Sequence, residues 1–146
     1  MQQPIEVLLL SSKFKKLYDK KIGKMAEHYG LTSNEVNILL FLVNNPGYDT
    51  AKDISELRLL PKACVSRSVD SLIRQGFLTS HEDEKDRRIL HLSILPAAQS
   101  LVEDAQTSQQ EFFSCIYRNF SESERRMLNA LTDKVLINMK EELEKC

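Results

Sequence analysis

Ser66 and Arg67 are the residues of this sequence whose types and spacing best suit a chemical task at the protein surface. They lie early in "KACVSRSVDSLIRQG", where apolar residues recur three and four positions apart, as on one face of a helix. A planar guanidinium can bond O6 and N7 of guanine together, and a serine hydroxyl suits a phosphate or a base edge. Lys62, at the start of the same segment, could contact a phosphate. The alternative is that all three are ordinary solvated helix residues.

A second charged cluster follows in "EDEKDRR", which is far more charged than a plain turn needs. Its bases are Lys85, Arg87 and Arg88. Its first three acids, at positions 82–84, would oppose binding to a polyanion and soften non-specific affinity. Taken alone, the cluster would be a solvated turn. Because the formal net charge of the chain is only −1, any nucleic-acid signal must come from such local clusters.

The elements around the first cluster predict two short helices joined by a tight bend. Thr50 and Asp53 form a capping pattern at the start of the first helix, in which Ile54 and Leu57 are expected to point inward. The bend falls at Leu59-Leu60-Pro61, and proline suits the first turn of the next helix. An inner stripe is expected in the second helix, which ends before Gly76: Val65, Val69, Leu72 and Ile73. This arrangement matches a helix-turn-helix.

The second cluster sits at the tip of a predicted β-hairpin. Residues 77–80 form one arm, and residues 90–94 return with alternating apolar and polar positions. The hairpin would place the basic tip next to the exposed side of the preceding helix.

Long amphipathic helices are predicted on both sides of this lobe. Residues 5–29 and 96–120 have apolar positions at helical spacing. Capping boxes open two further helices, with Thr32 and Glu35 in one and Ser121 and Glu124 in the other. The apolar faces of the first helix and the last two are wider than a small lobe could cover. A second copy of the chain is the simplest partner for that surface.

Composition sets limits on the function classes. The chain has 146 residues, of which 42% are hydrophobic and 28% charged, as in ordinary globular domains. No apolar run approaches the length of a membrane span, and the first residues do not have the pattern of a signal peptide. The three cysteines are far apart in the sequence, which suggests free thiols in a reducing cytoplasm. The three histidines lack metal-site spacing. We find no nucleophile–base pair and no phosphate-binding glycine loop, so we expect neither an enzyme, nor a metal site, nor a cofactor.

Three motifs carry a resemblance over nearly the whole chain: "LTSNEVNILLFL", "VSRSVDSLIRQGFL" and "DEKDRRILHLSILP". Their order resembles the MarR family of winged helix-turn-helix transcription regulators. The resemblance implies a mainly α fold with a small β-wing (α+β), as a single domain over residues 1–146. The winged helix-turn-helix lobe would span residues 31–96, and residues 1–30 and 97–146 would be dimerisation helices. The sequence departs from the family pattern at Leu60-Pro61, Leu95 and Ala98.

The resemblance also implies partners and roles. Relatives are homodimers that place two lobes over adjacent major grooves of a near-palindromic operator, and many are repressors released by a small ligand or by oxidation. In the family, an arginine at the position of Arg88 enters the minor groove and an acid at the position of Asp86 braces the wing. Arg87 and Lys85 would then contact the DNA backbone.

Four aromatic residues could line an effector pocket between the lobe and the dimerisation helices: Phe14, Tyr18, Phe41 and Tyr48. The alternative is that they are simply core. Cys64 lies on the second helix of the helix-turn-helix, where oxidation could block binding. A buried, inert cysteine is the commoner case. Thiol-sensing relatives carry the reactive cysteine in the first helix, where this chain has none.

The sequence therefore favours a sequence-specific DNA-binding regulator acting on double-stranded DNA as a homodimer. The alternative is a winged-helix interaction module that has lost DNA binding. The acidic residues of the wing and the near-neutral total charge are consistent with this alternative.

Overall fold

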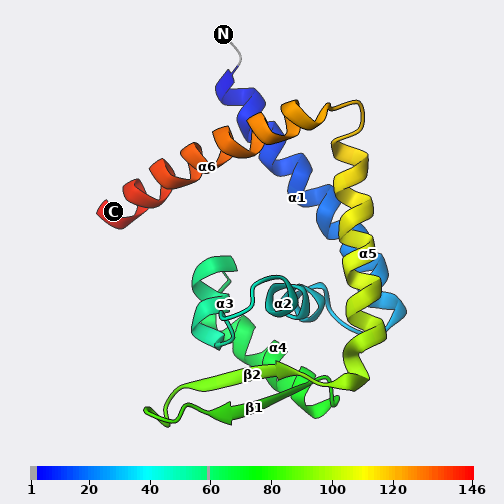
Figure 1. Cartoon of the computed structure of the whole chain (residues 1–146), viewed down its shortest axis with the longest axis vertical. Coiled ribbons are helices and arrows are strands. Elements are labelled where there is room, and N and C mark those ends of the chain that lie inside the picture. The colour runs from blue at the N-terminus through cyan, green and yellow to red at the C-terminus, as the bar shows by residue number, and fades with distance from the viewer. Residues whose placement is uncertain (1–2, 59) are drawn as a thin grey trace. The chain divides into compact units, whose positions relative to one another are not determined.

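The computed structural model describes residues 3–58 and 60–146, with the backbone alone for residues 3–5. The chain forms two compact units, Met1–Phe112 and Phe113–Cys146. Figure 1 labels the elements along the chain. Their bounds are α1 Gln3–His28, α2 Ser33–Asn44, α3 Ala51–Arg58, α4 Lys62–Arg74, β1 Leu78–Glu82, β2 Leu90–Ile94, a 3-10 turn at Pro96–Ala98, α5 Gln99–Ile116 and α6 Glu122–Lys145. This is the expected mainly helical fold with one small antiparallel sheet.

The expected capping boxes are present where helices begin. At the start of α2 the Thr32 Oγ1 accepts from the Glu35 amide at 3.1 Å, and the Glu35 carboxylate accepts from the Thr32 amide at 2.9 Å. Thr50 and Asp53 make the same pair of bonds before α3. Each box satisfies two amides that a helix start leaves without intrahelical partners, so these helix starts are fixed locally by the sequence.

The helix-turn-helix consists of α3 and α4, which pack against each other. Pro61 stands at the N-cap of α4 without a side-chain capping bond, and Leu59, expected in the bend, lies outside the described residues. Two expected core positions are wrong. Leu57 is 57% exposed because the two-turn α3 packs on α4 mainly through Ile54, and Ile73 is 37% exposed because it lies about 100° around the helix from the buried Leu72.

The wing is a two-stranded antiparallel hairpin with Ser80 opposite Leu92 and His81 opposite His91. The first arm is shifted relative to the expected residues 77–80, because pairing continues to Glu82. Leu78 and Leu92 are buried, whereas the residues at the tip are exposed or half-buried. Figure 1 shows the closed end of the hairpin projecting from the lobe.

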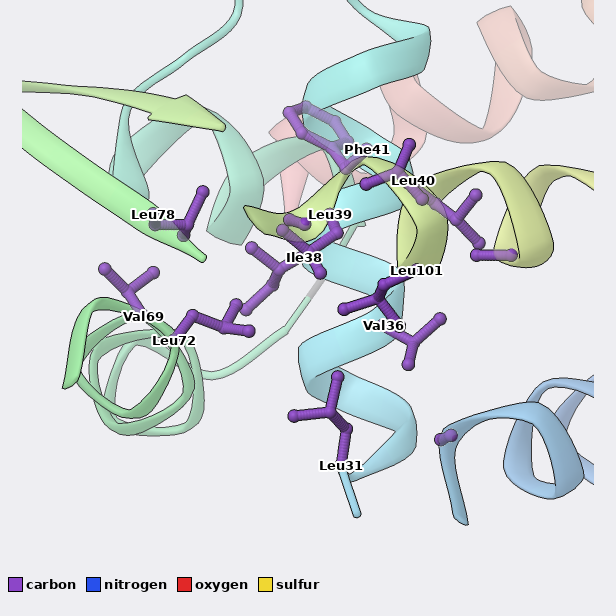
Figure 2. Close-up of a cluster of buried hydrophobic side chains, with 14 of the residues drawn as sticks. Leu31, Val36, Ile38, Leu39, Leu40, Phe41, Val69, Leu72, Leu78 and Leu101 are labelled. Atoms are coloured by element: carbon purple, nitrogen blue, oxygen red, sulfur yellow. The ribbon is translucent and has the colours of Figure 1, made fainter. Parts of the chain in front are cut away.

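One hydrophobic core holds the lobe together. Figure 2 shows side chains of α2 turned toward those of α4, β1 and α5, with Ile38 and Leu39 at the centre. Ile38, Leu39, Leu72 and Leu78 are each at most 2% exposed. Burying such side chains stabilises a fold by about 1.5–3 kcal/mol each, so this core fixes α4 and β1 relative to α2.

Two helices present apolar residues that their own unit leaves exposed. In α1 the second half is buried at Ile22 and Met25, but Leu10, Phe14 and Leu17 are 40–67% exposed. Within α6, which has no buried residue, the exposed apolar residues include Leu128, Leu131, Val135, Met139 and Leu143. Among the described residues, no helix is both long and apolar enough to cross a bilayer.

Candidate nucleic-acid interface

The exposed side of α4 carries the first basic cluster. Lys62, Ser66 and Arg67 are all exposed, while Val65 and Val69 of the same helix are buried in the core. The hydrophobic stripe therefore turns these three side chains toward solvent from a helix that is fixed along its other face. This is the geometry that lets a recognition helix present donors to base edges and phosphates.

A buried carboxylate ties the end of α4 to α2. Glu35 is 5% exposed, and its Oε2 accepts from the Ser71 hydroxyl at 2.7 Å and from the Gln75 side-chain amide at 3.0 Å. Burial alone would raise the pKa of Glu35, but bonds from Thr32, Ser71 and Gln75 outweigh it and leave the pKa lowered. The sequence indicated only the capping role. The contacts to Ser71 in α4 and to Gln75 at its C-cap join segments 36 and 40 residues apart, and no local pattern in the sequence indicates them.

Glu35→Ala is expected to lower the free energy of unfolding by about 2–3 kcal/mol, because the variant loses a cap and leaves partners of a charged acceptor unsatisfied. A carboxyl with a lowered folded pKa contributes stability above its unfolded pKa and loses it as pH falls through the folded pKa. The cost should therefore shrink in acid. Urea unfolding across pH measures it. As a control, Glu56→Ala at an exposed α3 position should lower the free energy of unfolding by at most ~0.5 kcal/mol. An equal loss of stability in both variants would contradict the role of Glu35 in joining α2 to α4.

At the wing tip, Asp86 holds Arg88 in place. Its carboxylate accepts from the Arg88 amide at 3.0 Å, from Nε at 3.1 Å and from Nη2 at 3.1 Å, which also keeps the pKa of Asp86 below its usual value. The Arg88 side chain is nevertheless 90% exposed. Arg87, 3.9 Å from Glu82, is also exposed, as is Lys85. The tip thus presents three basic side chains, one of them pre-oriented by a carboxylate.

Where the two strands meet the wing tip, His91 lies between two carboxylates. Its Nδ1 is 2.7 Å from Asp49 Oδ1 and its Nε2 is 2.8 Å from Asp83 Oδ1. The bonds to Asp49 and then Asp83 raise the pKa of His91 despite desolvation. The pKa of Asp83 is lowered, first by His91 and then by the amides of Lys85 and Asp86. From the sequence, Asp83 was expected only to oppose DNA binding through its negative charge. No local pattern in the sequence indicated its contact with His91.

Only two of the four expected pocket aromatics line the same cavity. Tyr18 and Phe41 line a cavity of about 80 Å³ with Asn37, and the Tyr18 hydroxyl accepts from the Gln109 amide at 3.1 Å. Phe14 and Tyr48 are not among its lining residues. Phe14 stacks on Tyr18, and Tyr48 is 52% exposed in the turn after α2. Small-molecule sites are usually ~300–1,000 Å³, so this cavity does not by itself indicate an effector.

A larger open groove of about 580 Å³ runs between α1 and α5. Its residues include Lys20, Lys24 and His28 from α1, with Asp104 and Glu111 from α5. From the sequence alone, these lysines are indicated only as part of the polar side of an amphipathic helix. Their meeting with α5 follows from packing between segments about 80 residues apart.

The three cysteines are free. Cys64 is half-buried, and its Sγ lies 3.0 Å from the side-chain amide nitrogen of Asn34 on α2. Cys115 and Cys146 are exposed. Whether Cys64 is redox-inert, as the sequence led us to expect, stays a prediction. Among the described residues, no group of three or more His, Cys, Asp or Glu side chains could hold a metal ion.

Known proteins share this architecture. Residues 29–89 match the MarR family model. The HTH-type transcriptional repressor YetL of Bacillus subtilis is 23% identical over 121 residues, which is 78% of this chain and 72% of that protein. A MarR transcriptional regulator from Methanosarcina mazei Go1 has a TM-score of 0.77 at 22% identity, covering 92% of this chain and 96% of that one. The S. aureus MepR–DNA complex has a TM-score of 0.72 at 20% identity, covering 94% and 98%. The resemblance of this chain to the MarR family of winged helix-turn-helix proteins is thus confirmed, by the family model over residues 29–89 and by the fold over most of the chain.

Proposed function

We propose that this protein is a sequence-specific DNA-binding transcriptional regulator, acting as a repressor. The observation that carries the proposal is the presence, on one lobe, of an exposed polar face on α4 and a projecting wing with three exposed bases. Ser66 and Arg67 read base edges in the major groove, and Lys62 contacts a phosphate. Arg88, which Asp86 orients through hydrogen bonds, enters the minor groove, while Arg87 and Lys85 contact the DNA backbone.

The relatives support this function. YetL is named a transcriptional repressor, and the MepR structure is a complex with DNA. Both match this chain over the lobe that carries the two basic clusters. The relatives are regulators, and the expectation that this chain is not an enzyme stays a prediction.

The protein acts as a homodimer on a near-palindromic operator. The exposed apolar residues of α1 and of α6 support this step, because large exposed apolar patches mark association sites. Two lobes related by a two-fold axis would read two half-sites about one helical turn apart. The boundaries expected from the sequence stay a prediction: residues 31–96 as the lobe, residues 1–30 and 97–146 as dimerisation helices.

A small-molecule effector and a cytoplasmic location stay predictions of the sequence. The 80 Å³ cavity at Tyr18 adds little support for an effector, while the groove between α1 and α5 has the size of a ligand site. Neither the cavity nor the groove is sufficient to support a proposed ligand.

Binding to the DNA that flanks the protein's own gene tests the proposal. Fluorescence anisotropy at two fixed salt concentrations is expected to show binding at least ~10³-fold tighter than to a random duplex of the same length. The affinity for random DNA should fall steeply with salt, since that binding is mostly phosphate contact. Flanking DNA can lack the operator, so genome-wide footprinting supplies the sites if the first duplexes fail. An absence of bound sites by both methods would favour the interaction module without DNA binding.

A further inference from the structure

His91 joins two segments that are distant in the sequence. Asp49 lies in the loop between α2 and α3, and Asp83 lies where β1 turns into the wing tip. The ring of His91, on β2, reaches a carboxylate oxygen of each at 2.7 and 2.8 Å. The Leu92 amide adds a bond of 2.8 Å to the Asp49 carbonyl, so the return strand is tied to the start of the helix-turn-helix twice.

The proton of His91 decides whether both carboxylate contacts can exist. A neutral imidazole has one N–H, so only one of its nitrogens donates and the other presents a lone pair. With a carboxylate at each nitrogen, losing the proton would set that lone pair against a carboxylate oxygen. The imidazolium donates to both, and charge-assisted bonds of this kind are the stronger ones.

We infer that His91 is a positioning residue of the wing: its imidazolium clamps Asp83 of the hairpin to Asp49 of the helix-turn-helix and so sets the angle at which Arg88 meets DNA. The inference rests on the proposed function. Three titratable groups face the ring: Asp49 from the α2–α3 loop, Asp83 from the wing, and His81, whose ring stacks on it at 5.4 Å. Of these groups, Asp49 and Asp83 raise the pKa of His91 through their hydrogen bonds to its ring.

The pH dependence has a definite sign. The pKa of His91 is raised, so its contribution is complete below the ordinary histidine value of ~6.5 and is lost as pH rises through the raised pKa. The pKa of Asp83 is lowered, so that carboxylate stays ionised throughout that range. The clamp should therefore open on the alkaline side of neutral pH, not in acid.

The clamp is tested without DNA by NMR titration of the histidine rings. His91 is expected to titrate above the ordinary value in the wild type, and at lower pH in both Asp49→Asn and Asp83→Asn. Hydrogen exchange of the Leu92 amide should quicken in Asp49→Asn. His81→Asn, the matched control on the facing strand, should leave the titration of His91 above the ordinary value. If the His91 titration were the same in the wild type and both aspartate variants, the clamp would be overturned.

DNA binding supplies the second test, at constant salt, on a duplex recovered by footprinting. Between pH 6 and pH 9, wild-type affinity should fall roughly two- to fivefold more than that of His91→Gln, the range for a partly exposed ion pair. His81→Asn should follow the wild type. Asp49→Asn removes a negative charge, so simple electrostatics predicts tighter binding, whereas the clamp predicts weaker binding. Tighter binding with a wild-type pH profile would overturn the inference. No binding at any pH would overturn the proposed function instead, and the titration would still decide the clamp.

Discussion

Leu131→Asp/Val135→Asp is expected to convert the protein from a dimer into a monomer and to lower operator affinity by roughly 10²- to 10⁴-fold. The size follows from linkage: when two lobes are joined, the second half-site is bound at a high effective concentration, and that advantage disappears when the lobes separate. Sedimentation at micromolar concentration should give about twice the 16.8 kDa chain mass for the wild type and one chain mass for the variant.

The two residues lie in the middle of an apolar stripe on α6. From Leu128 to Leu143 the apolar positions recur at three- and four-residue spacing, and the structure leaves them 36–64% exposed. None of the 24 residues of α6 is buried, so this helix gains little stability from packing within its own unit. Two adjacent carboxylates would have to be desolvated in any apolar interface formed there, which disfavours association.

Ile137→Asp is the matched control. Ile137 is 58% exposed on the same helix but lies nine residues after Leu128, about 180° around the axis. This variant should remain a dimer with operator affinity close to the wild type. Circular dichroism must show that each variant keeps its helical content. A wild-type protein that sediments as one chain and still binds its operator tightly would contradict the dimer.

Local patterns in the sequence predicted the local structure well. The capping boxes at Thr32 and Thr50 and the hairpin with its charged tip are confirmed, because each depends on residues only a few positions apart. The winged-helix fold followed from the order of these elements together with the family resemblance. The core positions failed at Leu57 and Ile73, where helical periodicity gives a direction but says nothing of how far a neighbouring element extends.

The supports of the candidate interface could not be predicted in this way. Glu35 meets Ser71 and Gln75 across 36 and 40 positions, and His91 meets Asp49 across 42. Such contacts are set by the packing of α2 on α4 and by the return of β2 to the lobe. A capping glutamate looks complete within its own helix, and a histidine between two leucines looks like a polar strand position. Only the tertiary structure shows that each is also a tie between elements.

Arg67→Ala is expected to cost about 1–3 kcal/mol on the operator, roughly 5- to 150-fold in affinity, and little on random DNA. Arg67 projects from the exposed side of a helix that the core and Glu35 hold in place, so its loss removes a positioned contact to a base. Arg88 has a different environment. It is braced by Asp86 on the wing, and a minor groove offers shape and negative potential but few distinguishing base edges.

Arg88→Ala should therefore weaken binding to operator and random DNA more evenly, with a salt dependence shallower by roughly one unit for the lost phosphate-like contact. Salt titrations of both variants on both duplexes measure the difference. Arg126→Ala, which removes the same charge from α6, controls for net charge and should change neither affinity by more than ~2-fold. Equal losses for Arg67→Ala and Arg88→Ala on both DNAs would mean that general electrostatics, not base readout, operates at α4. If neither variant lost affinity, the lobe would be better explained as a protein-interaction module, since neither basic cluster would then contribute to DNA binding.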